Sequence, residues 1–303
     1  MTSEPASYVG RFAPSPTGPL HFGSLLTAVA SFAQALVHRG EWLIRIEDID
    51  PPREQHGSDK LILDMLEAYG FEWNRPVSYQ STFAPRHDEL VACLLDQGLA
   101  YKCTCSRRDL ADATRGLLGA IYPGTCRNGC GSGAAAVRII VDDRPVEFED
   151  ALQGPYGHQL QSVSGDFVIK RRDGLIAYHL AVVIDDFDQG ITEIVRGIDL
   201  MDSTPRQIYL QRQLGFTTPA YMHVPIAVNG DRQKLSKSTG ARPISAENAG
   251  KELCMALHCL DQNVPAGLAD EGVSTIWQWV SENWSARELR FKKEIPATLH
   301  GYG

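Results

Sequence analysis

The sequence has no surplus of positive charge. Its 29 Lys and Arg residues are outnumbered by 37 Asp and Glu residues, so the formal net charge is −8 at pH 7. Proteins that bind nucleic acid over a broad surface usually carry a basic face. Any contact with nucleic acid must therefore be made by a small local patch.

Long apolar runs are missing as well. No stretch approaches the roughly 20 apolar residues that a membrane-spanning helix needs, and the opening segment MTSEPASYVG has neither a basic segment nor an apolar run. Both absences predict a cytoplasmic protein. Hydrophobic residues make up 43% of the 303 residues and charged residues 22%, which excludes disordered and low-complexity classes. The length predicts roughly two domains and permits a monomer.

Cysteine is scarce and odd in number, with seven residues, of which Cys103, Cys105, Cys126 and Cys130 lie close together in the sequence. In a reducing compartment, this grouping indicates a metal site rather than disulfides. Thiolates at such a spacing suit tetrahedral zinc, and on chemical grounds Cys130 is a better fourth ligand than a phenol. Unligated buried cysteines are the alternative, which the Gly-rich stretch around them disfavours.

Strands and helices alternate along most of the chain. Residues 7–12 and 42–47 predict strands on either side of a helix from Gly23 to Gly40, which together form a βαβ unit. Further helices are predicted from Ser58 and Thr204 and over residues 85–97, 252–260, 273–280 and 285–291, and further strands over residues 137–141, 146–148, 167–170, 179–184, 191–196 and 224–228. This order predicts a mainly parallel sheet with ligands beyond the carboxyl ends of its strands.

Residues 11–24, RFAPSPTGPLHFGS, join the first predicted strand to the first helix. Gly23 lets a ligand approach the helix start, the free N–H groups there attract anions, and His21 can donate a hydrogen bond to phosphate. Taken alone, such a segment is more often a proline-rich turn that orients a helix. The segment is therefore a candidate nucleotide site that needs a second feature beside it.

A basic loop, DRQKLSKS at residues 231–238, supplies that feature. Its lysines and serines can neutralise a triphosphate as charge develops on a departing pyrophosphate. Together, the two segments resemble the signature pair of the class I aminoacyl-tRNA synthetases. The opening segment resembles the glutamyl and glutaminyl branch, in which Ser24 can replace the final histidine. Three further segments resemble the same branch, namely RIEDID at 45–50, YHLAVVIDD at 178–186 and VRGIDLMDSTPRQ at 195–207. The resemblance therefore covers nearly all of residues 7–242.

The resemblance implies an α/β fold. We expect a Rossmann-like class I catalytic core with a zinc-bearing insert and a small helical C-terminal subdomain. The two halves of the core would comprise residues 1–100 and 138–242, the insert residues 101–137, and the subdomain residues 243–303.

A pocket for a dicarboxylic amino acid needs cations for the carboxylates and an acid for the ammonium group. Arg11, Arg196 and Glu47 fit these needs. The resemblance implies that glutamate lies against Arg11, Phe12, Ala13, Pro14, Ser15, Glu47, Tyr178 and Arg196. The alternatives are a surface ion pair between Arg196 and Asp199 and a core position for Tyr178.

The implied reaction is the formation of glutamyl-adenylate from glutamate and ATP, with Mg²⁺ accompanying the nucleotide. We expect catalysis by positioning and charge stabilisation, without a general base. The resemblance assigns catalysis to His21, Lys234 and Lys237, and ATP binding to His21, Gly23, Ser24, Lys234, Ser236 and Lys237.

The chain ends soon after Ser238, which leaves room for one small helical subdomain but not for a large anticodon-binding part. In this it is similar to short glutamyl-tRNA synthetase paralogues, which activate glutamate without tRNA and attach it to the queuosine base in the anticodon loop of tRNA(Asp). Lys170, Arg171 and Arg172 are candidates for gripping that anticodon stem-loop, or form an exposed charged turn.

The same paralogues share a Cys-x-Cys and Tyr-x₃-Cys pattern, which implies zinc ligation by Cys103, Cys105, Tyr122 and Cys126, with Cys130 as the alternative to the tyrosine. Three other functions are weighed against this reading. They are a minimal glutamyl-tRNA or glutaminyl-tRNA synthetase that charges the tRNA 3′ end, a different nucleotidyltransferase with the histidine motif, and a zinc-bearing RNA-binding module with a degenerate core.

Overall fold

The computed structural model describes residues 7–106, 108–229, 231–235 and 243–296. The helices are α1 (Phe22–Val37), α2 (Ser58–Ala68), α3 (Ala84–Asp96), α4 (Leu160–Val163), α5 (Tyr178–Asp188), α6 (Thr204–Leu214), α7 (Ala249–Cys259) and α8 (Val273–Asn283). The strands are β1 (Val9–Phe12), β2 (Glu41–Ile46), β3 (Ser78–Tyr79), β4 (Ala100–Cys103), β5 (Arg115–Gly116), β6 (Gly119–Ala120), β7 (Ala136–Ile139), β8 (Pro145–Asp150), β9 (Gly154–Gln159), β10 (Val168–Lys170), β11 (Glu193–Gly197), β12 (Ala220–Val224), β13 (Ile226–Val228) and β14 (Glu294–Pro296).

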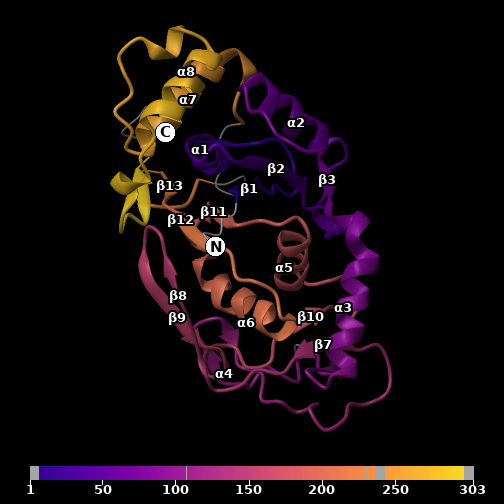
Figure 1. Ribbon diagram of the computed structural model, residues 1–303. Coiled ribbons are helices and arrows are strands. Elements are labelled where there is room, and N and C mark those ends of the chain that lie inside the picture. The colour runs from indigo at the N-terminus through magenta and orange to yellow at the C-terminus, as the bar shows by residue number, and fades with distance from the viewer. Residues whose placement is uncertain (1–6, 107, 230, 236–242, 297–303) are drawn as a thin grey trace, which may run out of the picture.

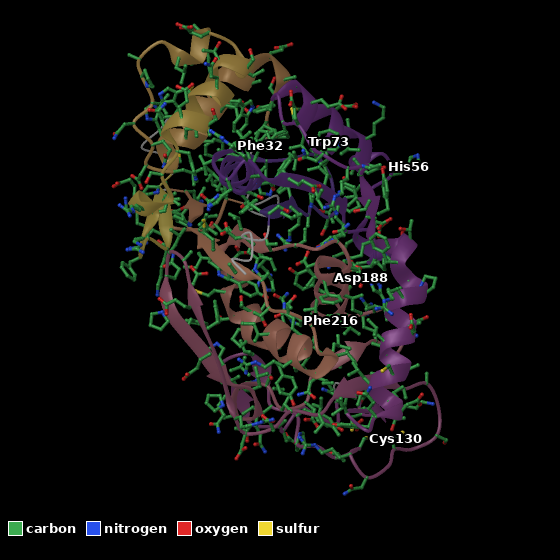
Figure 2. All side chains as sticks on the ribbon, in the orientation of Figure 1. Phe32, His56, Trp73, Cys130, Asp188 and Phe216 are labelled. Atoms are coloured by element: carbon green, nitrogen blue, oxygen red, sulfur yellow. The ribbon has the colours of Figure 1, made fainter. Side chains whose placement is uncertain are left out.

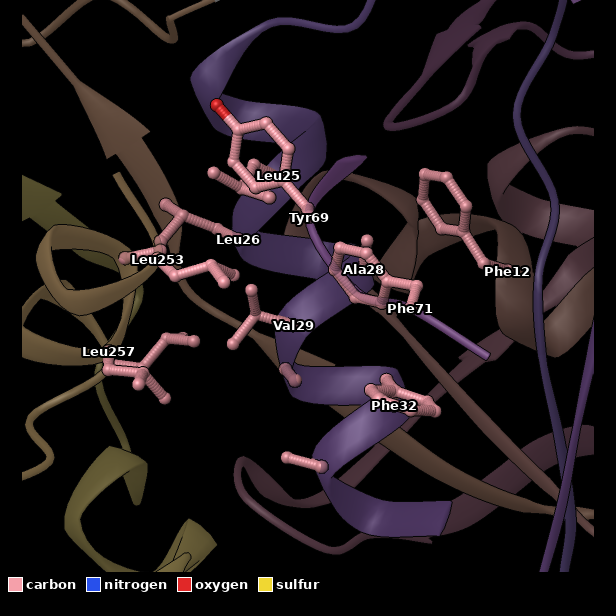
Figure 3. Packing of buried hydrophobic residues seen from close by; sticks show 14 of the residues in the cluster. Phe12, Leu25, Leu26, Ala28, Val29, Phe32, Tyr69, Phe71, Leu253 and Leu257 are labelled. Carbon is pink, nitrogen blue, oxygen red and sulfur yellow. The ribbon is translucent and has the colours of Figure 1, made fainter. Parts of the chain in front are cut away.

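The βαβ unit predicted for the first fifty residues is confirmed. Strand β1 pairs in parallel with β2, with Val9 opposite Glu41, and α1 connects them. Helix α1 is strongly apolar and is covered by α7 and α8 from the C-terminal part of the chain (Figure 1). In Figure 3, Leu253 and Leu257 of α7 lie against Leu26 and Val29 of α1. The last helices therefore complete the hydrophobic core around the first one.

Two parallel pairs of strands meet beside α1. Strand β11 pairs in parallel with β12, and the Thr192 N–H, which precedes β11, donates to the Val9 carbonyl of β1 at 2.9 Å. The sheet β1-β2-β3 therefore adjoins the sheet β11-β12-β8-β9. The carboxyl ends of β1, β2 and β11 line one cleft, as expected where strands run parallel. The prediction of a mainly parallel sheet does not hold throughout, because β7 pairs antiparallel with both β4 and β10, and β8 pairs antiparallel with β9.

The strand predicted over residues 179–184 is wrong, because this run lies inside helix α5. Every residue from Leu180 to Asp186 is buried. A helix that is buried on all sides carries no polar face, so its apolar run has the same pattern as a buried strand. The helix matters for the site because Asp185 and Asp186 bond from it to neighbouring elements, including Arg11 of β1.

Other differences are local. Helix α2 begins at Ser58, as predicted, directly after Gly57, which has a positive φ of 78°. Thr204 is likewise the first residue of α6, and Pro225 divides the run 224–228 between β12 and β13. The helix predicted over 285–291 is a single 3₁₀ turn at Ala286–Leu289. Among the described residues, no helix has the length and apolar character that a membrane crossing requires.

The described residues after the basic loop pack back against earlier parts of the chain. Strand β14 pairs in parallel with β13, with Ile226 opposite Glu294. The Trp277 indole of α8 donates to the Tyr69 carbonyl at 2.8 Å. The C-terminal part is thus held against both α2 and the strand that leads into the basic loop.

Candidate functional site

A cleft of about 890 Å³ opens where β1, β2 and β11 end. It brings together the described residues that the sequence assigned to glutamate or ATP, namely Arg11, Phe12, Ala13, Pro14, Ser15, His21, Gly23, Ser24, Glu47, Tyr178, Arg196 and Lys234. Ser236 and Lys237 lie outside the described residues. The two signature segments, far apart in the sequence, therefore line one cavity.

At one side of the cleft, Arg11 is fixed by a buried ion pair. Its Nε and Nη2 atoms donate to Asp186 of α5 at 3.1 and 3.3 Å. The Nη1 atom of Arg45 contacts the same carboxylate at 2.8 Å. Burial opposes the ionisation of Asp186, but the two guanidinium groups hold its pKa below the usual range. Asp186 is therefore a shared anchor for two arginines.

Glu47 lies next to this anchor, just after β2. Its Oε1 atom is 3.4 Å from Nη2 of Arg45, and only 9% of its side chain is exposed. Burial raises the pKa of Glu47, although the charges of Arg45 and Arg11 oppose the rise. A further cation from a ligand would favour the ionised form of Glu47.

Arg196, on β11, is held from three directions. Its Nε atom donates to Nε2 of His223 at 3.1 Å, and its Nη2 atom donates to Oγ1 of Thr204 and Oε1 of Gln207, both at 2.7 Å. Its buried Nη1 atom has no hydrogen-bond partner in the described part of the chain. An unpaired charged donor that is buried is costly, so this atom is suited to an acceptor that a ligand supplies.

The alternatives considered for two of these residues do not hold. Arg196 is only 3% exposed, so it does not form a surface ion pair. Asp199 instead accepts a hydrogen bond from Lys234 Nζ at 2.5 Å. Tyr178 is half-buried and lines the cleft at the start of α5 rather than the core.

His21 caps helix α1. Its Nδ1 atom accepts from the Ser24 N–H at 3.3 Å, and its Nε2 atom lies 3.2 Å from Ser24 Oγ. One N–H group at the helix start is therefore already bonded to the histidine. The imidazole is thereby oriented at the wall of the cleft.

Gly23 is needed for a close approach between the two signature segments. A Cβ atom at this position would lie 2.7 Å from the Leu235 carbonyl oxygen. The Leu235 N–H donates to Ala227 of β13 at 2.8 Å, which fixes the position of that carbonyl. The missing side chain thus lets the base of the basic loop contact the helix start.

Several buried residues that support the site from behind the cleft were missed from the sequence. Asp185 accepts from Gln80 and His87 of the neighbouring segment, each at 2.6 Å. Arg45 and Asp186 belong to motifs that were recognised, but they had no assigned role. Charged residues within otherwise apolar strand and helix runs were the available signal, because buried charges are rare unless they are paired.

The cysteine group lies apart from the cleft, in the segment after β4. The ligand atoms of Cys103, Cys105 and Cys126 all lie within 4.8 Å of one another, so they could hold a metal ion. The Tyr122 hydroxyl is 3.3 Å from the Cys103 sulfur and 3.5 Å from the Cys105 sulfur. The Tyr122 hydroxyl also accepts from the Cys126 N–H at 3.0 Å, and its bond with the Cys126 thiol lowers the pKa of that thiol to about 7.

Cys130 does not join this group. It is exposed, and Figure 2 shows it on a loop at the end of the molecule opposite Phe32. Tyr122, in contrast, is 4% exposed, and the Arg138 guanidinium lies 3.8 Å above its ring. The fold thus places the phenol, and not the fourth thiol, beside the three cysteines.

The basic patch at residues 170–172 is already paired within the chain. The contacts are Lys170 with Asp88 at 2.6 Å, Arg171 with Asp173 at 2.6 Å, and Arg172 with the Thr104 carbonyl at 2.5 Å. Exposed ion pairs such as the first two contribute little to stability.

Comparison with known proteins gives a consistent result. Residues 8–252 match the family described as tRNA synthetases class I (E and Q), catalytic domain. A glutamyl-Q tRNA(Asp) synthetase of Pseudomonas paraeruginosa is 49% identical over 297 residues, which cover 98% of this chain and 99% of that protein. A glutamyl-Q tRNA(Asp) synthetase of Dechloromonas aromatica is 50% identical over 283 residues, covering 92% of this chain and 94% of that protein.

Solved structures resemble the chain in fold. A glutamate tRNA ligase from Elizabethkingia meningosepticum, solved with its amino acid, has a TM-score of 0.79 over 97% of this chain and 68% of that chain, at 21% identity. A glutamate-tRNA synthetase from Elizabethkingia anophelis has a TM-score of 0.81 over 97% of this chain and 69% of that chain, also at 21% identity. The α/β catalytic core expected from the sequence is confirmed.

Proposed function

Because the chain belongs to the class I family of tRNA synthetases for glutamate and glutamine, we propose that it is a ligase that activates L-glutamate with ATP in the absence of tRNA. It then transfers the glutamyl group to the queuosine base in the anticodon loop of tRNA(Asp). The acceptor is supported by relatives about half identical over nearly their full length, which bear the name glutamyl-Q tRNA(Asp) synthetase.

The observation that most directly supports glutamate as the amino acid is the buried Arg196 Nη1 atom, which has no hydrogen-bond partner among the described residues. It shares the cleft with Arg11 and Glu47, so one ligand can meet two cations and one acid. Glutamate offers two carboxylates and one ammonium group, which matches this set. The amide oxygen of glutamine could also accept from this donor, but the amide carries no negative charge, so it would compensate the charges of Arg11 and Arg196 less well than a carboxylate.

Activation follows from the charge distribution along the cleft. A carboxylate oxygen of glutamate attacks the α-phosphorus of ATP, and pyrophosphate leaves with the electron pair of the broken P–O bond. The nucleophile is already an anion, so no general base is needed. His21, Lys234 and Lys237 would stabilise the charge on the phosphates, with Gly23, Ser24 and Ser236 also at the nucleotide. Mg²⁺ would accompany ATP.

In the transfer step, a nucleic-acid hydroxyl attacks the carbonyl carbon of the adenylate and forms an ester bond. The bond between that carbon and the phosphate oxygen breaks, AMP leaves, and the hydroxyl proton passes to solvent. The chain's net charge of −8 fits an enzyme that grips a stem-loop through a local patch. Lys170, Arg171 and Arg172 would exchange their present partners for phosphates of that stem-loop. We place the protein in the cytoplasm as a monomer.

The cysteine group would hold one structural zinc ion. Cys103, Cys105 and Cys126 supply three thiolates, and the Tyr122 hydroxyl beside two of their sulfurs supplies the fourth ligand. Bound zinc would hold together a segment that has few strands of its own and would take no part in the chemistry.

The proposal is tested by glutamate-dependent exchange of labelled pyrophosphate into ATP without tRNA. We expect exchange with glutamate and none with glutamine. Exchange that appears only when tRNA is added would instead favour a minimal glutamyl-tRNA synthetase. The absence of exchange under both conditions would favour an RNA-binding module and contradict the proposed activation.

A further inference from the structure

A buried series of hydrogen bonds connects the β8–β9 turn to the arginine in the cleft. Nδ1 of His223 lies 2.6 Å from Oδ2 of Asp150, and Nε2 of His223 accepts from Nε of Arg196 at 3.1 Å. Asp150 is 2% exposed and His223 is fully buried. Neither of these two residues lines the cleft that Arg196 lines.

The donors and acceptors along this series fix one tautomer of the histidine. A guanidinium has no acceptor, so Nε2 of His223 must be the unprotonated nitrogen that receives the Arg196 N–H. The imidazole proton then lies on Nδ1 and points to the Asp150 carboxylate, which can only accept. Thr204 fits the same assignment. Its Oγ1 atom accepts from Arg196 Nη2 and lies 3.1 Å from His223 Nε2, so its own hydrogen can be donated to that unprotonated nitrogen.

Asp150 is itself held in place by the backbone. Its Oδ1 atom accepts from the N–H groups of Leu152 and Gln153 at 3.0 and 2.9 Å, and its Oδ2 atom accepts from the His223 N–H at 3.1 Å. Burial and the charge of Arg196 lower the pKa of His223, while the bond to Asp150 opposes this. A neutral imidazole beside Arg196 is consistent with the tautomer.

We infer that Asp150 and His223 are positioning residues for glutamate recognition, and that they hold the Arg196 guanidinium so that Nη1 is the donor left for the substrate. The inference rests on the proposed function, because it takes glutamate as the ligand of Arg196. Thr204 and Gln207 occupy Nη2, and His223 occupies Nε. In metal sites, residues that hydrogen-bond to the metal-binding histidines change the affinity for the metal without contacting it, and we expect Asp150 and His223 to act on Arg196 in the same way.

Two substitutions at position 223 separate positioning from packing. His223→Gln keeps a side-chain acceptor that can reach the place of Nε2, whereas His223→Leu fills space without one. In pyrophosphate exchange, we expect His223→Leu to raise the KM for glutamate about tenfold or more and His223→Gln to raise it about threefold or less. The KM for ATP and kcat should change less than about twofold in both variants.

Asp150→Asn provides a second test if His223→Leu does not fold. An amide N–H of the asparagine facing Nδ1 would move the imidazole proton to Nε2, against the Arg196 donor. We expect a rise of about tenfold in the dissociation constant for glutamate, measured by calorimetry without ATP. Nitrogen NMR should find the proton of His223 on Nδ1 in the unchanged protein.

The outcomes are distinguishable from a failure of the proposed function. If the wild-type protein neither exchanges pyrophosphate nor binds glutamate, both the proposed function and the positioning role are wrong. If it is active and the folded variants bind glutamate as the unchanged protein does, only the positioning role is contradicted. Equal effects on glutamate and ATP would also contradict it, because they indicate a general disturbance of the fold.

Discussion

Arg11 and Asp186 join β1 to α5 through a two-point ion pair, with N–O distances of 3.1 and 3.3 Å and 4% exposure of each side chain. Asp186 also contacts Arg45 of β2 at 2.8 Å. One carboxylate thus connects two strands and a helix directly behind the cleft. The position of Arg11 in the cleft therefore depends on a residue that the substrate does not need to touch.

Asp186→Asn should destabilise the protein, because it leaves two buried guanidinium groups undercompensated. We expect a loss of about 3–5 kcal/mol in the free energy of unfolding, measured by denaturant titration. Asp64→Asn is a matched control, since Asp64 is 52% exposed and pairs with Lys60 on the surface of α2. That variant should unfold like the unchanged protein.

The same ion pair gives the stability a pH dependence of known sign. The pKa of Asp186 is depressed in the folded protein. Its stabilisation is therefore fully present above the pKa of an unfolded aspartate, about 3.9, and is lost as the pH falls through the folded value. Asp186→Asn should flatten this part of the stability curve, and an unchanged slope in the variant would contradict the assignment.

Glutamate binding should release protons. Burial raises the pKa of Glu47 in the free protein, and the substrate ammonium group would favour the carboxylate and lower that pKa. Affinity for glutamate should therefore increase with pH until Glu47 is ionised in the free protein, and then level off. Calorimetry in two buffers of different ionisation enthalpy measures the protons released. Glu47→Gln should release fewer protons, and equal release by both proteins would contradict the role of Glu47.

Zinc content distinguishes the two candidates for the fourth ligand. Cys130→Ser should keep one zinc per chain, because Cys130 is exposed and does not belong to the cluster of Cys103, Cys105 and Cys126. Tyr122→Phe should lose zinc more readily in a competition with a chelator, since its hydroxyl lies beside two of the sulfurs. Loss of metal from the Cys130 variant alone would show that the thiol is the ligand.

Gly23→Ala should impair activation without abolishing glutamate binding. The added methyl group would lie 2.7 Å from the Leu235 carbonyl oxygen and must displace the base of the basic loop. Overpacking of this kind costs about 1–3 kcal/mol in folding stability. The displaced loop would also misplace Lys234 at the phosphates, so kcat for exchange should fall about tenfold. Gly131→Ala is the control, because its Cβ would meet Thr104 at an ordinary 3.5 Å. Unchanged kcat in Gly23→Ala would show that the close approach is not required.

Those parts of the fold and the site that lie within one continuous segment of the chain could be predicted from the sequence. Residues 11–24 contain a strand end, a turn and a helix start, so their local order already defines one wall of the cleft. Helix α5 could not be predicted in the same way, because its residues Leu180 to Asp186 are all buried and lack a polar face. Its apolar run was therefore predicted as a strand.

Contacts between distant residues were beyond the sequence for a different reason. Asp150 lies 73 positions from His223, and Arg11 lies 175 positions from Asp186. Only the packing of the sheets and helices brings these pairs together. Likewise, spacing offered both Tyr122 and Cys130 as zinc ligands, while the fold placed the phenol beside the thiols and the fourth cysteine on an exposed loop.

The central claim concerns the acceptor, and labelled glutamate tests it most directly. The protein is incubated with ATP, labelled glutamate and either tRNA(Asp) that carries queuosine or the same tRNA(Asp) without it, with tRNA(Glu) in parallel. We predict that label is incorporated only into tRNA(Asp) with queuosine. Equal labelling of both forms of tRNA(Asp), or labelling of tRNA(Glu) alone, would contradict the account.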